Sequence, residues 1–181
     1  LHIDYPKLWK KAEKLSKKYL KAKPFPHYVI DNFFTKETYK KIKNNFPKVN
    51  SKIWKAPTNI HTVKKYVTKR GIHNLKETLF SENQRQILHE LNSSLFLNFL
   101  EKITSIPGLV PDPYFAEASF AYGSNGGHLD IHADFSHHDK MKLERRINVI
   151  FYLNDNWKKS YAGNLNLYNQ KLKSIKEIFP I

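Results

Sequence analysis

An alternating run of polar and apolar side chains at residues 126–134 most constrains what this chain can fold into. The run reads Gly-Gly-His-Leu-Asp-Ile-His-Ala-Asp. Successive side chains of a β-strand point to opposite faces, so the apolar residues would face a core and the polar residues would face away from it. Residues two apart on a strand lie about 6.6 Å apart at Cα, a gap that an imidazole and a carboxylate can close around one ion. We therefore predict a strand here, with His132 and Asp134 as a metal-binding pair.

Three other histidines lie close to this pair in the sequence. His128 would share the strand face but lies about 13 Å from His132 along an extended chain, too far to bind the same ion. His137 and His138 follow in a predicted loop and could line a substrate pocket, although surface positions are the simpler interpretation. Because the chain has no cysteine, a metal site has to use His and carboxylate ligands.

A second strand-like run, residues 145–154, reads Arg-Arg-Ile-Asn-Val-Ile-Phe-Tyr-Leu-Asn, and residues 161–168 read Tyr-Ala-Gly-Asn-Leu-Asn-Leu-Tyr. Together with His-x-Asp after a Gly-rich turn, these motifs resemble the iron(II)- and 2-oxoglutarate-dependent oxygenases, specifically their prolyl-4-hydroxylase-like branch. Residues 24–34, Pro-Phe-Pro-His-x-x-Ile-Asp-Asn-Phe-Phe, resemble an opening of the same branch. The resemblance therefore involves both ends of the chain.

The resemblance implies a fold of the α+β class, mainly β, with a double-stranded β-helix (jelly-roll) core and supporting N-terminal helices. It also implies one oxygenase domain over residues 1–181. Relatives carry a second metal-binding His, and then a basic residue, beyond the position of Ile181, where this sequence ends. We therefore expect that the sequence is a portion of a longer protein, without its C-terminal closing strands and without the distal His that would be the third metal ligand.

The cofactors that the resemblance implies are Fe(II), 2-oxoglutarate and O2, with ascorbate as a further candidate. His132 and Asp134 match metal ligands of the family and are the catalytic candidates. Tyr122 and Tyr152 match tyrosines that bind 2-oxoglutarate in relatives, and Arg145 matches an arginine that pairs with the metal-bound Asp and orients it. The alternatives are two ordinary core tyrosines and a solvent-facing His and Asp.

By the same resemblance, the expected reaction is hydroxylation of an aliphatic carbon, with succinate and CO2 as co-products. A prolyl residue of a protein or peptide is the first substrate that we expect, and free amino acids, sugars and lipids stay open as small-molecule substrates, since a fold does not determine a substrate. Two other functions compete with this one. They are a nucleic-acid demethylase-type oxygenase and a non-catalytic jelly-roll binding module.

The net charge of +15 arises from 31 Lys and Arg against 16 Asp and Glu, and such an excess suits a nucleic-acid partner. However, nearly all of it is Lys mixed with abundant Asn and Ile, which AT-rich codon usage also produces, and readers of bases and phosphates are more often Arg. Nucleic acid is therefore the less favoured partner. No apolar run approaches a membrane span and no signal-peptide core follows the N-terminal charges, so we expect no membrane partner and a cytoplasmic location.

Helical patterns dominate the N-terminal half. Residues 4–20 are expected to form one amphipathic helix, with Asp4 as its N-cap and Pro6 in its first turn. A short strand is expected at residues 27–31, followed by a second helix that Thr35 caps.

A capping box of the Ser-x-x-Gln type at residues 81–84 predicts the start of one long helix that ends before residue 106. Its apolar stripe would consist of Leu88, Leu91, Leu95, Phe99 and Ile103. Strands are also expected at residues 60–68 and 114–122, the second leading into the His-x-Asp run.

Overall fold

The computed structural model describes residues 1–48, 50–52, 69–72 (backbone only), 80–115, 118, 120–123, 125–127, 129–134 and 136–180. The helices are α1 (Tyr5–Trp9), α2 (Ala12–Lys21), α3 (Lys36–Asn44), α4 (Glu82–Leu91), α5 (Ser94–Thr104) and the short 3-10 helix η3 (Lys159–Tyr161). The strands are β1 (Lys69–Ile72), β2 (Phe120–Gly123), β3 (His137–His138), β4 (Leu143–Glu144), β5 (Leu165–Tyr168) and β6 (Ser174–Ile178).

The chain forms two compact units, each built from separate stretches of sequence. The first unit contains Leu1–Asn45, Ser81–Pro111 and Phe151–Ile181, and the second contains Phe46–Phe80 and Asp112–Ile150. The five α-helices of the described ranges lie in the first unit, whereas the His-x-Asp segment lies in the second. One oxygenase domain over residues 1–181 stays a prediction.

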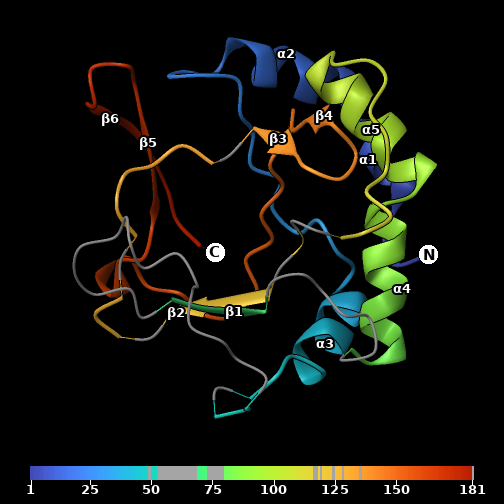
Figure 1. Ribbon diagram of the computed structural model, residues 1–181, viewed down its shortest axis with the longest axis vertical. Helices are drawn as coiled ribbons and strands as arrows, with labels where there is room; N and C mark the ends of the chain where they lie inside the picture. Colours follow the sequence, from blue (N-terminus) through green and yellow to red (C-terminus); the bar gives the residue numbers. More distant parts are fainter. Residues whose placement is uncertain are drawn as a thin grey trace. The chain divides into compact units, whose positions relative to one another are not determined.

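Two helices replace the single helix predicted for residues 4–20, so that prediction is wrong in its continuity. The predicted N-cap is confirmed, because the Asp4 side chain accepts a hydrogen bond from the Lys7 N–H at 3.0 Å. The first helix ends where the Lys11 N–H bonds to the Leu8 carbonyl at 3.0 Å, a tighter turn than an α-helix makes. Both α1 and α2 then contact α5, and Figure 1 shows α2 beside α5 at the top of the picture.

The long helix predicted from residue 82 is likewise two helices. Its capping box is confirmed, since Ser81 and Gln84 exchange side-chain and backbone hydrogen bonds. A second N-cap then interrupts it, because the Ser93 hydroxyl accepts from the Phe96 N–H and starts α5. The new start changes the buried face: Phe96 and Leu100 are buried, whereas Leu95 of the predicted stripe is 45% exposed. The predicted end before residue 106 is confirmed.

The first unit has its core between these helices. Phe99 is 1% exposed and meets Trp9 edge-on, with ring centroids 6.1 Å apart. At the start of the chain, the buried Glu90 carboxylate accepts hydrogen bonds from the backbone N–H groups of His2 and Ile3.

No helix in the described part of the chain is long and apolar enough to cross a membrane.

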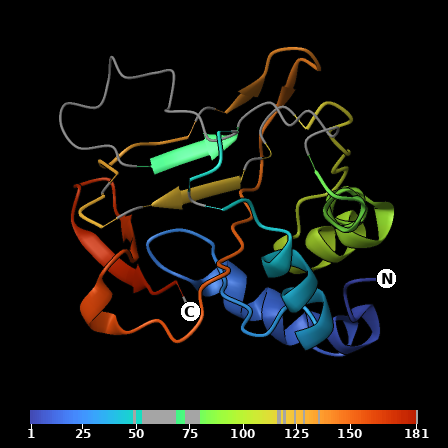
Figure 2. The same ribbon diagram turned by 90° about the horizontal axis from the view of Figure 1, so that it is seen from below.

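The described strands form three antiparallel pairs, β1 with β2, β3 with β4, and β5 with β6. Figure 2 shows β1 and β2 side by side, with Arg70 opposite Tyr122 in their register. Three two-stranded sheets do not confirm a double-stranded β-helix, which therefore stays a prediction. Helices also hold more of the described residues than strands do, so the expectation of a mainly β chain is not met in these ranges.

Several predicted strands are wrong in the described residues. Residues 27–31, 129–134 and 145–154 form no strand there, and the predicted strand at 114–122 is reduced to β2. A strand needs a partner for its backbone groups, and the alternating pattern could not supply one. The strand predicted at residues 60–68 lies outside the described residues.

Candidate metal centre

The second unit brings the predicted pair together on a loop. His132 Nε2 lies 3.4 Å from Asp134 Oδ1, and the two side chains are 47% and 43% exposed. Typical bonds of about 2.0–2.2 Å from His and carboxylate ligands allow two donor atoms of one ion to lie up to about 4.4 Å apart. The pair therefore fits one divalent ion, although the strand that was predicted to carry it does not form.

The other nitrogen of the His132 ring sets its protonation. Nδ1 lies 2.7 Å from the carbonyl oxygen of Asp130. Because a carbonyl oxygen can only accept, Nδ1 carries the proton and the neutral ring keeps its lone pair on Nε2. Metal-binding histidines generally donate their second N–H to a carbonyl or carboxylate in this way. The ring is thus oriented so that the nitrogen facing Asp134 can bind a metal.

Two donors from the described part of the chain face the second carboxylate oxygen of Asp134. Asn148 Nδ2 donates to Oδ2 at 2.7 Å, and Arg145 Nη2 lies 3.5 Å from the same oxygen. Asp134 is the partner that the resemblance implies for Arg145. The role of Arg145 in orienting a metal-bound carboxylate stays a prediction.

Sequence reasoning missed Asn148. Residues three apart on a strand point to opposite faces, so the strand predicted for 145–154 separated Asn148 from Arg145. The described backbone is not a strand there, and both side chains reach Asp134. Two signals were available: Asn148 is a defined position of the Arg-x-x-Asn motif in residues 145–154, and it is polar between Ile147 and Val149, where a buried strand would carry an apolar residue.

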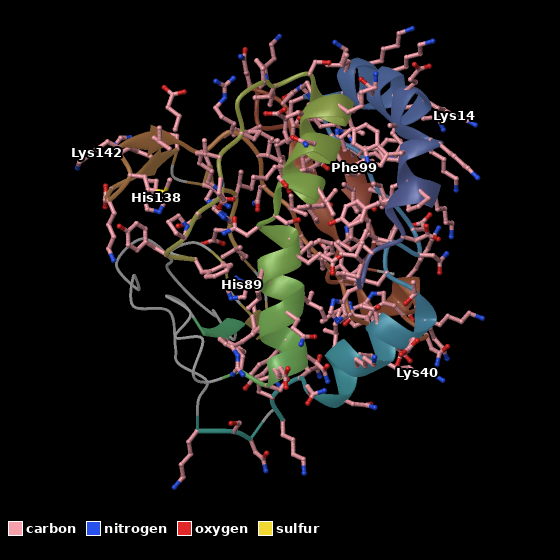
Figure 3. The ribbon with its side chains drawn as sticks, turned by 90° about the vertical axis from the view of Figure 1, so that its right-hand side faces the viewer. Lys14, Lys40, His89, Phe99, His138 and Lys142 are labelled. Atoms are coloured by element: carbon pink, nitrogen blue, oxygen red, sulfur yellow. The ribbon has the colours of Figure 1, made fainter. Side chains whose placement is uncertain are left out.

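The two histidines after Asp134 belong to the β3–β4 hairpin, where Figure 3 labels His138 together with Lys142. His138 is structural: its Nδ1 accepts from the Met141 N–H at 3.1 Å, and its Nε2 lies 3.3 Å from an Asp112 carboxylate oxygen. His137 is exposed, as predicted. The Arg145 N–H donates to the Ser136 carbonyl at 2.7 Å just beyond the hairpin, which places Arg145 next to the Asp134 segment.

The two predicted 2-oxoglutarate ligands lie in different units. Tyr122 is in β2 of the second unit, and Tyr152 follows Phe151 at the start of a stretch of the first unit. Burial raises the pKa of the Tyr152 phenol above its ordinary value, so this phenol is a neutral hydrogen-bond donor at physiological pH.

His128 lies outside the described residues. Within the described ranges, no three His, Asp or Glu side chains gather to hold a metal ion.

Comparison with protein families gives one match. Residues 118–181 match the model of the 2OG-Fe(II) oxygenase superfamily, and this segment includes His132, Asp134 and their described partners. No curated protein and no solved structure matches the chain. The family match does not single out the prolyl-hydroxylase branch.

Proposed function

We propose that this chain is a dioxygenase that hydroxylates an aliphatic carbon. Its match over residues 118–181 supports membership of the 2OG-Fe(II) oxygenase superfamily. The observation that carries the proposal is the pair formed by His132 Nε2 and Asp134 Oδ1, 3.4 Å apart. Imidazole and carboxylate are the protein ligands of non-haem iron(II) oxygenases. These two donors therefore fit iron(II). The third protein ligand of such a centre would be a residue other than His132 and Asp134.

Each residue of the centre has a separate task. His132 and Asp134 would hold the metal, and the Asp130 carbonyl keeps the proton on Nδ1 so that Nε2 is free to bind. When bound, iron(II) and 2-oxoglutarate supply the chemistry that inserts an oxygen atom from O2 into a C–H bond, with succinate and CO2 as co-products. Tyr122 and Tyr152 would bind 2-oxoglutarate. A protonated Tyr152 suits this task because it can donate to a carboxylate.

The proposed substrate is a prolyl residue in a protein or peptide. Support for this choice comes from the Arg-x-x-Asn-x-x-x-Tyr-Leu-Asn motif of residues 145–154 and from residues 24–34, which resemble the prolyl-4-hydroxylase-like branch. The Cβ, Cγ and Cδ atoms of a prolyl ring are aliphatic carbons with no acidic hydrogen. Their hydroxylation therefore needs the oxidative chemistry proposed for this centre rather than acid-base chemistry alone.

The test of this function is turnover with a proline-rich peptide, iron(II), 2-oxoglutarate and O2. We expect succinate release together with a gain of one oxygen atom on a prolyl residue, measured by mass spectrometry, and neither product from His132→Ala. A matched peptide with alanine in place of proline controls for substrate. Succinate release with no modified proline would reject the prolyl substrate. Absence of both products would favour a non-catalytic binding module, and equal amounts of product from protein and variant would reject His132 as a metal ligand.

A nucleic-acid substrate is the second candidate, and exposed lysines at the N-terminal helices favour it. Eight lysines of the first 25 residues are all exposed: Lys7, Lys10, Lys11, Lys14, Lys17, Lys18, Lys21 and Lys23. In Figure 3, Lys14 extends away from the helices. Binding to phosphates releases counterions, so affinity for single-stranded DNA should fall about 10³-fold or more between 50 and 200 mM salt if six or more phosphates are contacted. Absence of binding at low salt would reject this candidate.

A further inference from the structure

We propose that Asn148 is a positioning residue that holds Asp134 as a ligand through one oxygen only. This inference rests on the proposed function, because it concerns the same centre. The two oxygens of Asp134 have different surroundings: Oδ1 faces His132 Nε2 at 3.4 Å, whereas Oδ2 accepts the Asn148 amide at 2.7 Å. The amide therefore occupies the oxygen that points away from His132 and leaves Oδ1 for the metal.

Asp134 needs such a partner because little else fixes its carboxylate. The terminal torsion of an aspartate side chain is broad and roughly two-fold, so it does not by itself fix the plane of the carboxylate relative to a metal. Packing does not fix it either, because the Asp134 side chain is 43% exposed. Orientation of the carboxylate then depends on the polar groups that contact it.

Of the two groups at Oδ2, Asn148 makes the better hydrogen bond. Its 2.7 Å separation is at the short end of the normal range for N–H···O, whereas Arg145 Nη2 at 3.5 Å lies beyond that range. The Arg145 guanidinium contributes positive charge near Asp134, and the Asn148 amide contributes a directional hydrogen bond. The two oxygens of a carboxylate are equivalent, so the Asn148 hydrogen bond does not choose between them but fixes the plane of the group. One oxygen then stays on the amide while the other faces His132.

The structure also explains why a neutral amide suits this position. A carboxylate at residue 148 would repel Asp134, and a second basic residue beside Arg145 would compete with the metal for the same ligand. An amide nitrogen donates without adding charge to the centre. Asn148 can therefore orient Asp134 and leave its negative charge available to the metal.

The experiment measures metal binding without turnover. Mn(II) is titrated into the protein while the electron paramagnetic resonance signal of the free ion reports how much is bound. We expect Asn148→Ala and Asn148→Leu to bind Mn(II) about 10- to 100-fold more weakly than the unmodified protein, the usual effect of losing a residue that orients a metal ligand. Val149→Ala is the matched control, because it shortens the next side chain, which has no hydrogen-bond donor.

Circular dichroism and thermal unfolding of each variant show that it is folded, and His132→Ala separates the two claims. If the unmodified protein binds Mn(II), His132→Ala does not, and Asn148→Ala binds as the unmodified protein does, the positioning role is wrong and the proposed function stands. If the unmodified protein binds no better than His132→Ala, the metal centre itself is wrong, and the role of Asn148 fails with it.

Discussion

The core of the first unit and the candidate centre of the second unit are held by different forces. Phe99 is 1% exposed among the helices, whereas His132 and Asp134 are 47% and 43% exposed. The His132 ring donates a hydrogen bond to the Asp130 carbonyl, and Asp134 accepts one from Asn148. Burial stabilises the first arrangement and directional polar contacts stabilise the second. Substitutions in the core should therefore change the free energy of unfolding, and substitutions around Asp134 should change ligand binding.

The largest expected effect on stability is in the core of the first unit. Phe99→Ala should lower the free energy of unfolding by about 3–5 kcal/mol, because it removes a buried ring and leaves a cavity next to Trp9. Urea unfolding measures this change. Leu95→Ala on the same helix is the control: Leu95 is 45% exposed, so its loss should change stability by no more than about 0.5 kcal/mol. Similar costs at both positions would contradict the buried face described for α5.

The next effect belongs to the centre and should not follow stability. Arg145→Ala should weaken Mn(II) binding about 10-fold or more, because the guanidinium faces Asp134 Oδ2 at 3.5 Å. Arg146→Ala removes the same charge from the neighbouring position, where the guanidinium faces Glu144 instead. Comparison of the two affinities separates the specific contact from net charge. Removal of a positive charge by itself should strengthen the binding of a cation, so equal losses in both variants would contradict a specific role for the Arg145 contact.

The smallest effect concerns an exposed polar contact of the first unit. The Tyr39 hydroxyl donates to Asp155 at 2.6 Å, and burial, followed by this hydrogen bond and the negative charge of Asp155, raises the Tyr39 pKa to about 12. A phenol with a raised pKa in the folded state contributes stability that is fully present below pH 10 and is lost as pH rises toward 12. Because the contact is exposed, we expect the loss to be below about 1 kcal/mol.

Tyr39→Phe provides the comparison for this pH dependence, since it keeps the ring and removes the titrating hydroxyl. The free energies of unfolding of protein and variant, measured in urea at several pH values between 8 and 12, should converge as pH rises. At the acidic end, the Lys43 ammonium and the Tyr39 hydroxyl lower the pKa of Asp155 below its ordinary value, so the contribution of this carboxylate is lost only on strong acidification. Parallel curves from pH 8 to 12 would contradict the raised Tyr39 pKa.

Signals contained in a few neighbouring residues could be predicted from the sequence. The N-caps at Asp4, Thr35 and Ser81 were predicted from local residue type and spacing and are confirmed by side-chain hydrogen bonds. Each cap depends on residues within about one helical turn. The break at Ser93 was missed although serine is a good N-cap, because the apolar residues on both sides continue at helical spacing.

Features that need a distant partner could not be predicted in the same way. Alternation at residues 129–134 suggested a strand, yet a strand requires a neighbour that the pattern does not specify. The candidate centre survived this error, since His132 and Asp134 are close enough in sequence to meet on a loop. Asn148 was missed because its contact with Asp134 depends on how two separate segments approach one another.

The most direct test of the central claim is an anaerobic titration with iron(II) and 2-oxoglutarate, followed by the weak visible charge-transfer band that their chelate produces. The account predicts that the band forms with the unmodified protein and is absent from His132→Ala, because that substitution removes the Nε2 donor next to Asp134. A folded, unmodified protein that gives no band, or a band that persists unchanged in His132→Ala, would contradict the assignment of His132 and Asp134 as the metal-binding pair.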